Sequence, residues 1–101
     1  MARNRVELSG RLLERGALRH TPAGLAALEF RLAHESELEE AGVTRRVEAE
    51  ISAVAFAAQA RLVAARPLGS AVNVEGFLSA KSKRSKRLIL HVTNIEFVEG
   101  E

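Results

Sequence analysis

The sequence predicts an all-β fold, a small barrel of five strands with a short helical segment between the third and fourth strands. Apolar and polar residues alternate with a period of two along five segments, which is typical of half-buried strands. One segment, 57–65, is instead rich in alanine, the best helix former. With 101 residues the chain has room for one compact domain, which we expect to span residues 1–101.

The first two strands are expected over residues 5–12 and 25–36. In the first, Val6 and Leu8 alternate with charged and polar residues. Gly10 weakens a strand interior, so it predicts a bulge or a sharp bend. Residues 21–24 (Thr-Pro-Ala-Gly) predict a turn, because proline presets φ and glycine tolerates a positive φ. The second strand places one apolar set on one face: Ala26, Leu28, Phe30 and Leu32, followed by His34.

The alternation breaks in the acidic stretch 36–42, which ends in Gly42. This stretch predicts a hairpin tip, with a single helical turn as the alternative. A third strand is expected over residues 44–56. The alanine-rich helix then ends at residues 66–69 (Arg-Pro-Leu-Gly), because proline cannot continue a helix.

Two more strands are expected over residues 71–80 and 88–98. In the last one the apolar residues change face toward the end, which predicts a register change or a bulge. Long strands that change face suit a small, strongly bent barrel. Five strands with a helix between the third and fourth match the oligonucleotide/oligosaccharide-binding (OB) fold.

The composition excludes several kinds of chemistry. The chain has no cysteine, and all thirteen acidic residues are glutamate. Disulfides, thiolate catalysis, cysteine-ligated zinc and aspartate-dependent triads are therefore impossible. With no catalytic constellation in view, we expect no enzymatic activity, no cofactor and no metal site. Because no apolar run approaches the roughly 18 residues of a membrane helix, we expect no membrane partner and a cytoplasmic location.

Glutamates and histidines are the residues of this chain that could act as metal ligands. A cation site is disfavoured for the acidic cluster, because glutamate alone, without a coordinating loop, makes a poor site. A solvated hairpin tip or an acidic handle for a basic partner fits better. The histidines are far apart in the sequence and fit hydrogen-bonding strand residues better than ligands. The residues concerned are Glu35, Glu37, Glu39 and Glu40, and His20, His34 and His91.

Positive charge is concentrated in residues 81–87, which hold five of the fifteen cations and no acidic residue. One interpretation is a solubilising edge loop, since like charges repel and keep a loop solvated. The other is a phosphate-binding loop, since each cation that meets a phosphate releases counterions. In an OB barrel the loop between the last two strands binds ligands, which favours the second interpretation. It predicts DNA contacts from Lys81, Lys83, Arg84, Lys86 and Arg87.

The aromatic residues are four phenylalanines. Phe30 and Phe56 lie among apolar residues, so we expect them in the core. Phe77 shares its strand face with Asn73 and Glu75, which predicts an exposed ring. An exposed ring on an OB sheet offers a surface on which a nucleic-acid base can stack.

Short motifs follow one another along nearly the whole chain. They are Asn4-Arg5-Val6-Glu7-Leu8-Ser9-Gly10, Thr21-Pro22-Ala23-Gly24, Phe30-Arg31-Leu32-Ala33-His34, Glu39-Glu40-Ala41-Gly42, Gly76-Phe77-Leu78-Ser79 and Leu88-Ile89-Leu90-His91. Each motif alone is weak, but their order, spacing and total length are specific. Together they resemble the primosomal replication protein N (PriB) family, relatives of the single-stranded-DNA-binding proteins.

The resemblance implies an OB barrel that forms a homodimer and binds single-stranded DNA. It also implies a role without catalysis, in which the protein supports the replication-restart helicase PriA together with primosome proteins such as DnaT. By the same resemblance, Arg19, Arg45 and the loop 81–87 contact DNA. Aromatic residues that stack on bases in better-known members correspond here to Val43 and Glu48, and a further basic contact corresponds to Glu35. We therefore expect a retained basic loop and a lost stacking platform.

Three functional hypotheses remain open at this point. The leading one is a single-stranded-DNA-binding primosome-assembly protein. The second is a protein-interaction adaptor of the primosome with weak or incidental nucleic-acid binding, which the loss of aromatic residues favours. The third is an RNA-binding OB module, because cations that contact the backbone do not distinguish the two sugars.

Overall fold

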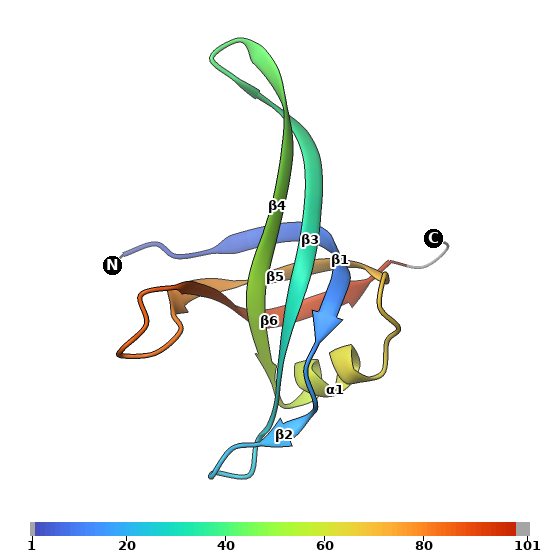
Figure 1. Ribbon diagram of the computed structural model, residues 1–101, viewed down its shortest axis with the longest axis vertical. Coiled ribbons are helices and arrows are strands. Elements are labelled where there is room, and N and C mark those ends of the chain that lie inside the picture. Colours follow the sequence, from blue (N-terminus) through green and yellow to red (C-terminus); the bar gives the residue numbers. More distant parts are fainter. Residues whose placement is uncertain (1, 99–101) are drawn as a thin grey trace.

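Five long strands close into a barrel in this computed structural model, which describes residues 2–98 (Figure 1). The elements along the chain are β1 (Val6–Arg15), β2 (Arg19–His20), β3 (Ala26–Glu40), β4 (Val43–Phe56), α1 (Ala58–Ala64), β5 (Ala71–Ala80) and β6 (Leu88–Phe97). The strands follow the order β1-β5-β6-β4-β3, and β3 pairs back onto β1. Helix α1 joins the third and fourth barrel strands, so the predicted OB barrel is confirmed.

Strand β1 closes the barrel because it changes partner along its length. Its first part pairs with β5 from Val6 to Arg11, and its last part pairs with β3 from Arg11 to Arg15. The register with β3 shifts at Leu13, and not at Gly10 where the bulge was predicted. Gly10 instead permits a close approach, since a Cβ there would lie 2.7 Å from the carbonyl oxygen of Ala33.

The register change predicted in the last strand is confirmed. Glu75 pairs with Asn94 and Gly76 with Val92, so Thr93 of β6 is left without a partner on β5. The Thr93 hydroxyl donates to the carbonyl of Glu75 (3.2 Å). This bulge explains why the apolar residues of β6 change face toward its end.

The core lies inside the barrel and continues under α1. Phe30 is 3 % exposed, which confirms its predicted place in the core. Ala60 and Val63 of α1 are fully buried and close one end of the barrel. Phe56 is 36 % exposed, so its predicted burial is wrong. Side chains alternate along β4, and because Ala55 points into the core, Phe56 points outward.

Helix α1 begins one residue later than predicted. Ala57 has a φ of 55°, which a helical residue cannot adopt, and its N–H donates to the carbonyl of Ala26 (2.8 Å). The predicted turn over residues 21–24 is confirmed by a bond from the Gly24 N–H to the Thr21 carbonyl (2.8 Å). In the described part of the chain no helix is long and apolar enough to cross a membrane.

Strands β3 and β4 continue well beyond the barrel as a two-stranded ribbon (Figure 1). The predicted tip, residues 36–42, is mostly strand, and no helical turn forms there. Only Ala41 and Gly42 make the turn, with φ values of 54° and 79°. Two positive φ values are typical of the tight turn whose twist matches that of the strands. We call residues 35–48 the arm.

Candidate nucleic-acid interface

The basic loop joins β5 to β6 and is closed at its base by a bond from the Lys81 N–H to the Arg87 carbonyl (2.8 Å). Two serine hydroxyls order its interior: Ser82 accepts from the Ser85 N–H (3.1 Å) and Ser85 from the Arg87 N–H (3.3 Å). All five predicted cations of the loop are exposed. Within residues 2–98 none of them forms an ion pair, so their charge is available to an anionic ligand.

Three aromatic rings lie in a ladder across the outer face of β5, β6 and β4. The centroids of Phe77 and His91 are 4.9 Å apart, with 11° between the ring planes. His91 and Phe56 follow at 6.2 Å and 24°. Phe77 is 39 % exposed, as predicted. Near-parallel, partly exposed rings are a surface on which bases can stack. We call Phe56, His91 and Phe77 the aromatic ladder.

The sequence predicts one member of this ladder, Phe77, and does not predict the other two. The sequence pattern predicts a core position for Phe56 and a hydrogen-bonding strand position for His91. The same expectation is confirmed for His34, whose ring nitrogens contact the Ser9 carbonyl (2.7 Å) and the Ser36 hydroxyl (2.9 Å). The signal for His91 was its cross-strand partner, because Phe77 and His91 are opposite one another in the β5–β6 register.

Arg19 and Arg45 lie apart from the loop. Arg19 is in β2, at the end of the molecule opposite to the tip of the arm, and Arg45 is near that tip (Figure 1). Each has a carboxylate partner: Arg19 contacts Glu29 (3.2 Å) and Arg45 contacts Glu40 (2.6 Å). The structure therefore does not gather the predicted cations into one patch.

Glu35 and Glu48 are opposite one another on the same face of the arm. Arg46 lies between them and donates from Nε to Glu48 (2.8 Å) and from a terminal nitrogen to Glu35 (3.0 Å). The hydrogen bond to Glu48, followed by the charge of Glu35, raises the pKa of the Arg46 guanidinium above its ordinary value. Val43 is 59 % exposed. The two positions that the sequence resemblance matches to stacking aromatics thus hold a valine and an ion-paired glutamate.

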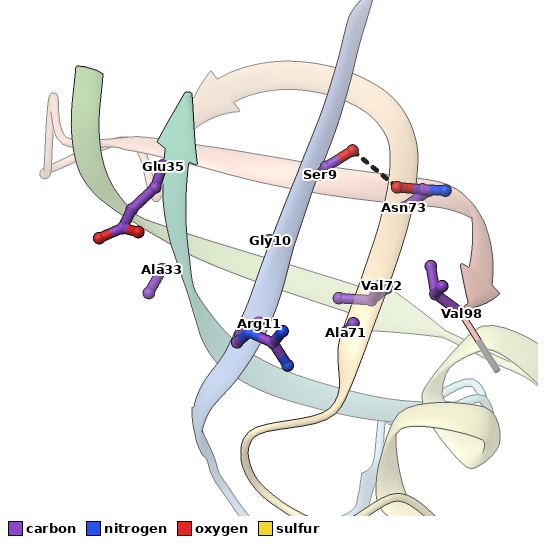
Figure 2. Close-up of a pocket in the computed structure, with 9 residues that line it drawn as sticks. All are labelled: Ser9, Gly10, Arg11, Ala33, Glu35, Ala71, Val72, Asn73 and Val98. Atoms are coloured by element: carbon purple, nitrogen blue, oxygen red, sulfur yellow. Dashed lines mark hydrogen bonds between the residues drawn. The ribbon is translucent and has the colours of Figure 1, made fainter. Parts of the chain in front are cut away.

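A depression of about 600 Å³ lies over β1 where it passes between β3 and β5. Figure 2 shows Glu35 and Ala33 on one side of β1 and the residues of β5 on the other, with the Ser9 hydroxyl bonded to Asn73 (2.7 Å). No group of three potential metal ligands occurs among the residues that the structure describes.

A second groove, of about 530 Å³, lies at the base of the basic loop. It is mostly apolar, and Arg87 and Leu88 form part of its wall. Its other apolar side chains are Val6, Leu8, Ala49, Ile51 and Leu78.

Known proteins resemble the chain in sequence and in structure. A family model described as another single-strand binding protein family matches residues 4–94. Replication restart protein PriB of Bordetella pertussis is 53 % identical over 97 residues, covering 96 % of this chain and 91 % of that protein. The structure of PriB from Ralstonia solanacearum has a TM-score of 0.85 at 30 % identity, covering 95 % of this chain and 98 % of that one.

The wild-type single-stranded DNA binding protein from Thermus aquaticus has a TM-score of 0.75 at 30 % identity, covering 96 % of this chain and 50 % of that one. The similarity in sequence thus extends along almost the full length of the PriB relatives, and the barrel is common to both groups. This chain belongs to the replication restart protein PriB family, which is related to the single-stranded-DNA-binding proteins.

Proposed function

We propose that this chain binds single-stranded DNA during replication restart and holds the strand by its phosphates on the loop 81–87. The observation that carries the proposal is the set of five exposed loop cations without a described acidic partner. In an OB barrel this loop borders the surface that binds oligonucleotides. Membership of the PriB family and the likeness to a single-stranded DNA binding protein support the same function.

The aromatic ladder supplies the base contacts in this proposal. Phe77 precedes Lys81 by four residues and His91 follows Arg87 by four, which places the backbone of each residue about 13 Å along its strand from the loop. The bases of a DNA strand that is held by the loop cations can therefore reach Phe77. Arg19 and Arg45 contribute only when a phosphate displaces Glu29 or Glu40, so their contacts are weaker than those of the loop.

The partners in this proposal are single-stranded DNA, PriA, other primosome proteins such as DnaT, and a second copy of the chain. Family membership supports the primosome partners. The homodimer has support from the strand edges as well. Beyond Ala33, β3 pairs only with β4, and β4 before Ala53 pairs only with β3. Each strand of the arm thus exposes one edge of backbone donors and acceptors, which favours association with another chain.

A second candidate function is that of an adaptor whose main contacts are with proteins. The observation that favours it is the pairing of cations with glutamates on β3 and β4: Arg31 with Glu50 (3.0 Å), and Arg46 with Glu35 and Glu48. These carboxylates occupy the guanidinium groups and repel phosphates. Under this alternative DNA binding is weak and incidental, and the helicase contact carries the function.

Replacing Lys81, Lys83, Arg84, Lys86 and Arg87 together with alanine tests the proposal. We expect most single-strand affinity to be lost, measured by fluorescence anisotropy of a labelled oligothymidylate at low salt. The fold should persist, since an exposed loop site changes stability by no more than roughly 0.5 kcal/mol. An Arg61→Ala variant, which removes a cation from α1, should bind like the wild type.

Unchanged DNA affinity in a folded quintuple variant would refute the loop assignment. Titration of the same variant with PriA distinguishes the two candidates, because an adaptor retains helicase binding and loses little function. A labelled oligouridylate measured in parallel tests the RNA-binding alternative, which predicts tighter binding to RNA than to DNA.

A further inference from the structure

Three leucines near the end of helix α1 have exposed side chains. Leu62 is 42 % exposed on the outer side of α1, and Leu68 is 57 % exposed in the connection from α1 to β5. Leu13 of β1 is 38 % exposed. A single exposed leucine is common on protein surfaces, but leucines that lie together are typical of a surface that binds another molecule.

Two hydrogen bonds bring these leucines to the same part of the surface. The Gly69 N–H donates to the Leu12 carbonyl (2.7 Å), so the connection that follows α1 runs directly beside β1. The Arg15 guanidinium donates to the carbonyl of Arg66, which is about one helical turn beyond Leu62. The end of β1 is therefore held against the end of α1. We call the three leucines, together with Arg15 and Arg61, the α1 patch.

The two arginines give the α1 patch a positive charge. Arg61 is on the exposed side of α1, and within residues 2–98 neither it nor Arg15 forms an ion pair. Glu14 is opposite Arg31 in the β1–β3 register, whereas Arg15 is opposite the buried Phe30. Partners across a strand pair share a face, so Glu14 points away from Arg15 and does not neutralise it.

This surface fits an acidic helix that has one apolar face. Leucines pack against aliphatic side chains, and guanidinium groups bind carboxylates. A nucleic-acid strand fits less well, because the Arg66 guanidinium covers the ring of Phe97 (4.5 Å to its centroid) and removes a surface for stacking. An added β-strand does not fit either, because the β1 backbone at Leu12 is already bonded to Gly69 and Ser70.

We propose that the α1 patch docks an acidic amphipathic helix of another protein, with the apolar side chains of that helix on the three leucines and its carboxylates on Arg15 and Arg61. Figure 1 shows α1 and the loop between β5 and β6 on different sides of the barrel. The contact therefore leaves the loop 81–87 accessible, and the chain can hold DNA and this protein at the same time. The contact goes beyond the proposed DNA binding and does not depend on it.

A synthetic amphipathic helix with leucine on one face and glutamate on the other is the probe for this contact. Titrated into the ¹⁵N-labelled protein, it should shift the amide signals of residues 13–15 and 61–69 in NMR spectra. A peptide with glutamine in place of every glutamate should bind at least tenfold more weakly. Saturating oligothymidylate should not displace the acidic peptide, because the two ligands use different surfaces.

Two pairs of substitutions test the charges and the leucines. Arg15→Glu with Arg61→Glu should weaken binding of the acidic peptide at least tenfold, measured by fluorescence anisotropy at physiological salt. A peptide with lysine in place of glutamate should bind this variant more tightly than it binds the wild type, which distinguishes a reversed charge from a lost fold. Leu62→Ser with Leu68→Ser should also weaken binding of the acidic peptide.

Lys83→Glu with Lys86→Glu is the matched control, because it makes the same change of net charge in the loop 81–87. It should bind the acidic peptide like the wild type. Equal affinities of the control and the Arg15/Arg61 variant, shifted signals confined to residues 81–87, or a wild type that does not bind the peptide would each overturn the α1 contact. Failure of the proposed function appears separately, as a wild type that does not bind the oligonucleotide.

Discussion

Gly76 of β5 lies very close to the backbone of the neighbouring strand β6. A Cβ at this position would lie 1.8 Å from the carbonyl oxygen of His91 and 2.8 Å from its carbonyl carbon. Both atoms are backbone, and they lie beside the bulge at Thr93, so the strands must move apart to admit any side chain. We expect Gly76→Ala to lower the free energy of unfolding by about 1–3 kcal/mol or more, measured by urea denaturation.

Gly16→Ala is the control for this prediction. Its nearest contact would be the Glu29 carbonyl oxygen at 3.5 Å, an ordinary van der Waals distance. Its stability should stay within about 0.5 kcal/mol of the wild type. Equal stabilities for the two variants would contradict the close strand contact at Gly76.

Glu48 is at the position that the sequence resemblance matches to a stacking aromatic residue. Its side chain is 63 % exposed and accepts a bond from Arg46. Glu48→Trp removes a carboxylate and adds a stacking surface, and one stacked base contributes about 1–3 kcal/mol. We therefore expect oligonucleotide affinity to rise by roughly five- to a hundredfold, measured by anisotropy at low salt.

Glu48→Gln separates the two causes, because it removes the charge without adding a ring. It should raise the affinity less than the tryptophan does. If neither variant binds more tightly than the wild type, this face of the arm does not contact the strand, and the aromatic ladder is the stacking surface.

At the scale of elements, the barrel strands could be predicted because each buries one face, so alternation in the sequence records the fold. The arm could not be predicted in the same way. Both of its faces meet solvent. Residues 36–42 therefore lack the alternation of apolar and polar residues, although β3 and β4 remain paired there. Strand β2 has only two residues, too few for any periodicity.

The candidate site could likewise be predicted only in part. The loop cations lie together in the sequence, so composition alone reveals them. The aromatic ladder requires the pairing of β5, β6 and β4, and the bulge at Thr93 shifts that pairing by one residue. The ion pairs of Arg46 likewise depend on the register that sets Glu35 opposite Glu48. Periodicity in the sequence does not predict which residues of distant segments become neighbours.

The start of α1 gives a prediction at the element scale. Ala57 joins β4 to α1 with φ and ψ of 55° and −127°, a conformation that is costly for any residue with a Cβ. Ala57→Gly removes that cost. We expect the free energy of unfolding to rise by about 1 kcal/mol, which corresponds to roughly 4–8 °C in Tm. Thermal unfolding followed by circular dichroism measures the change.

Ala58→Gly is the neighbouring control and should act in the opposite direction. Ala58 is the first residue of α1, where glycine lowers helix propensity by up to about 1 kcal/mol. If both glycine substitutions changed the stability in the same direction, the strained conformation of Ala57 would be contradicted.

At the scale of the whole molecule, charge is distributed very unevenly. The net charge of the chain is only +2, yet the loop 81–87 alone holds five cations. On the sheet face that β2, β3 and β4 form, Arg19, Arg31 and Arg46 are all paired with glutamates. A DNA strand that approaches the protein is therefore attracted mainly to the loop. The sheet face with the paired arginines offers little net positive charge.

This distribution predicts how DNA binding responds to salt. For single strands the logarithm of the affinity falls with the logarithm of the salt concentration by about 0.7 for each neutralised phosphate, so five engaged loop cations give a slope of roughly −3.5. The quintuple alanine variant should flatten this slope almost completely. Phe77→Ala should instead lower the affinity at every salt concentration and leave the slope unchanged, because stacking on an uncharged ring releases no counterions. Anisotropy titrations of the three proteins at four or more salt concentrations measure both quantities. Two outcomes would contradict this: a wild type that binds tightly at high salt, or a Phe77→Ala variant that changes the slope. Either would show that the loop does not supply the phosphate contacts and the ladder the base contacts as proposed.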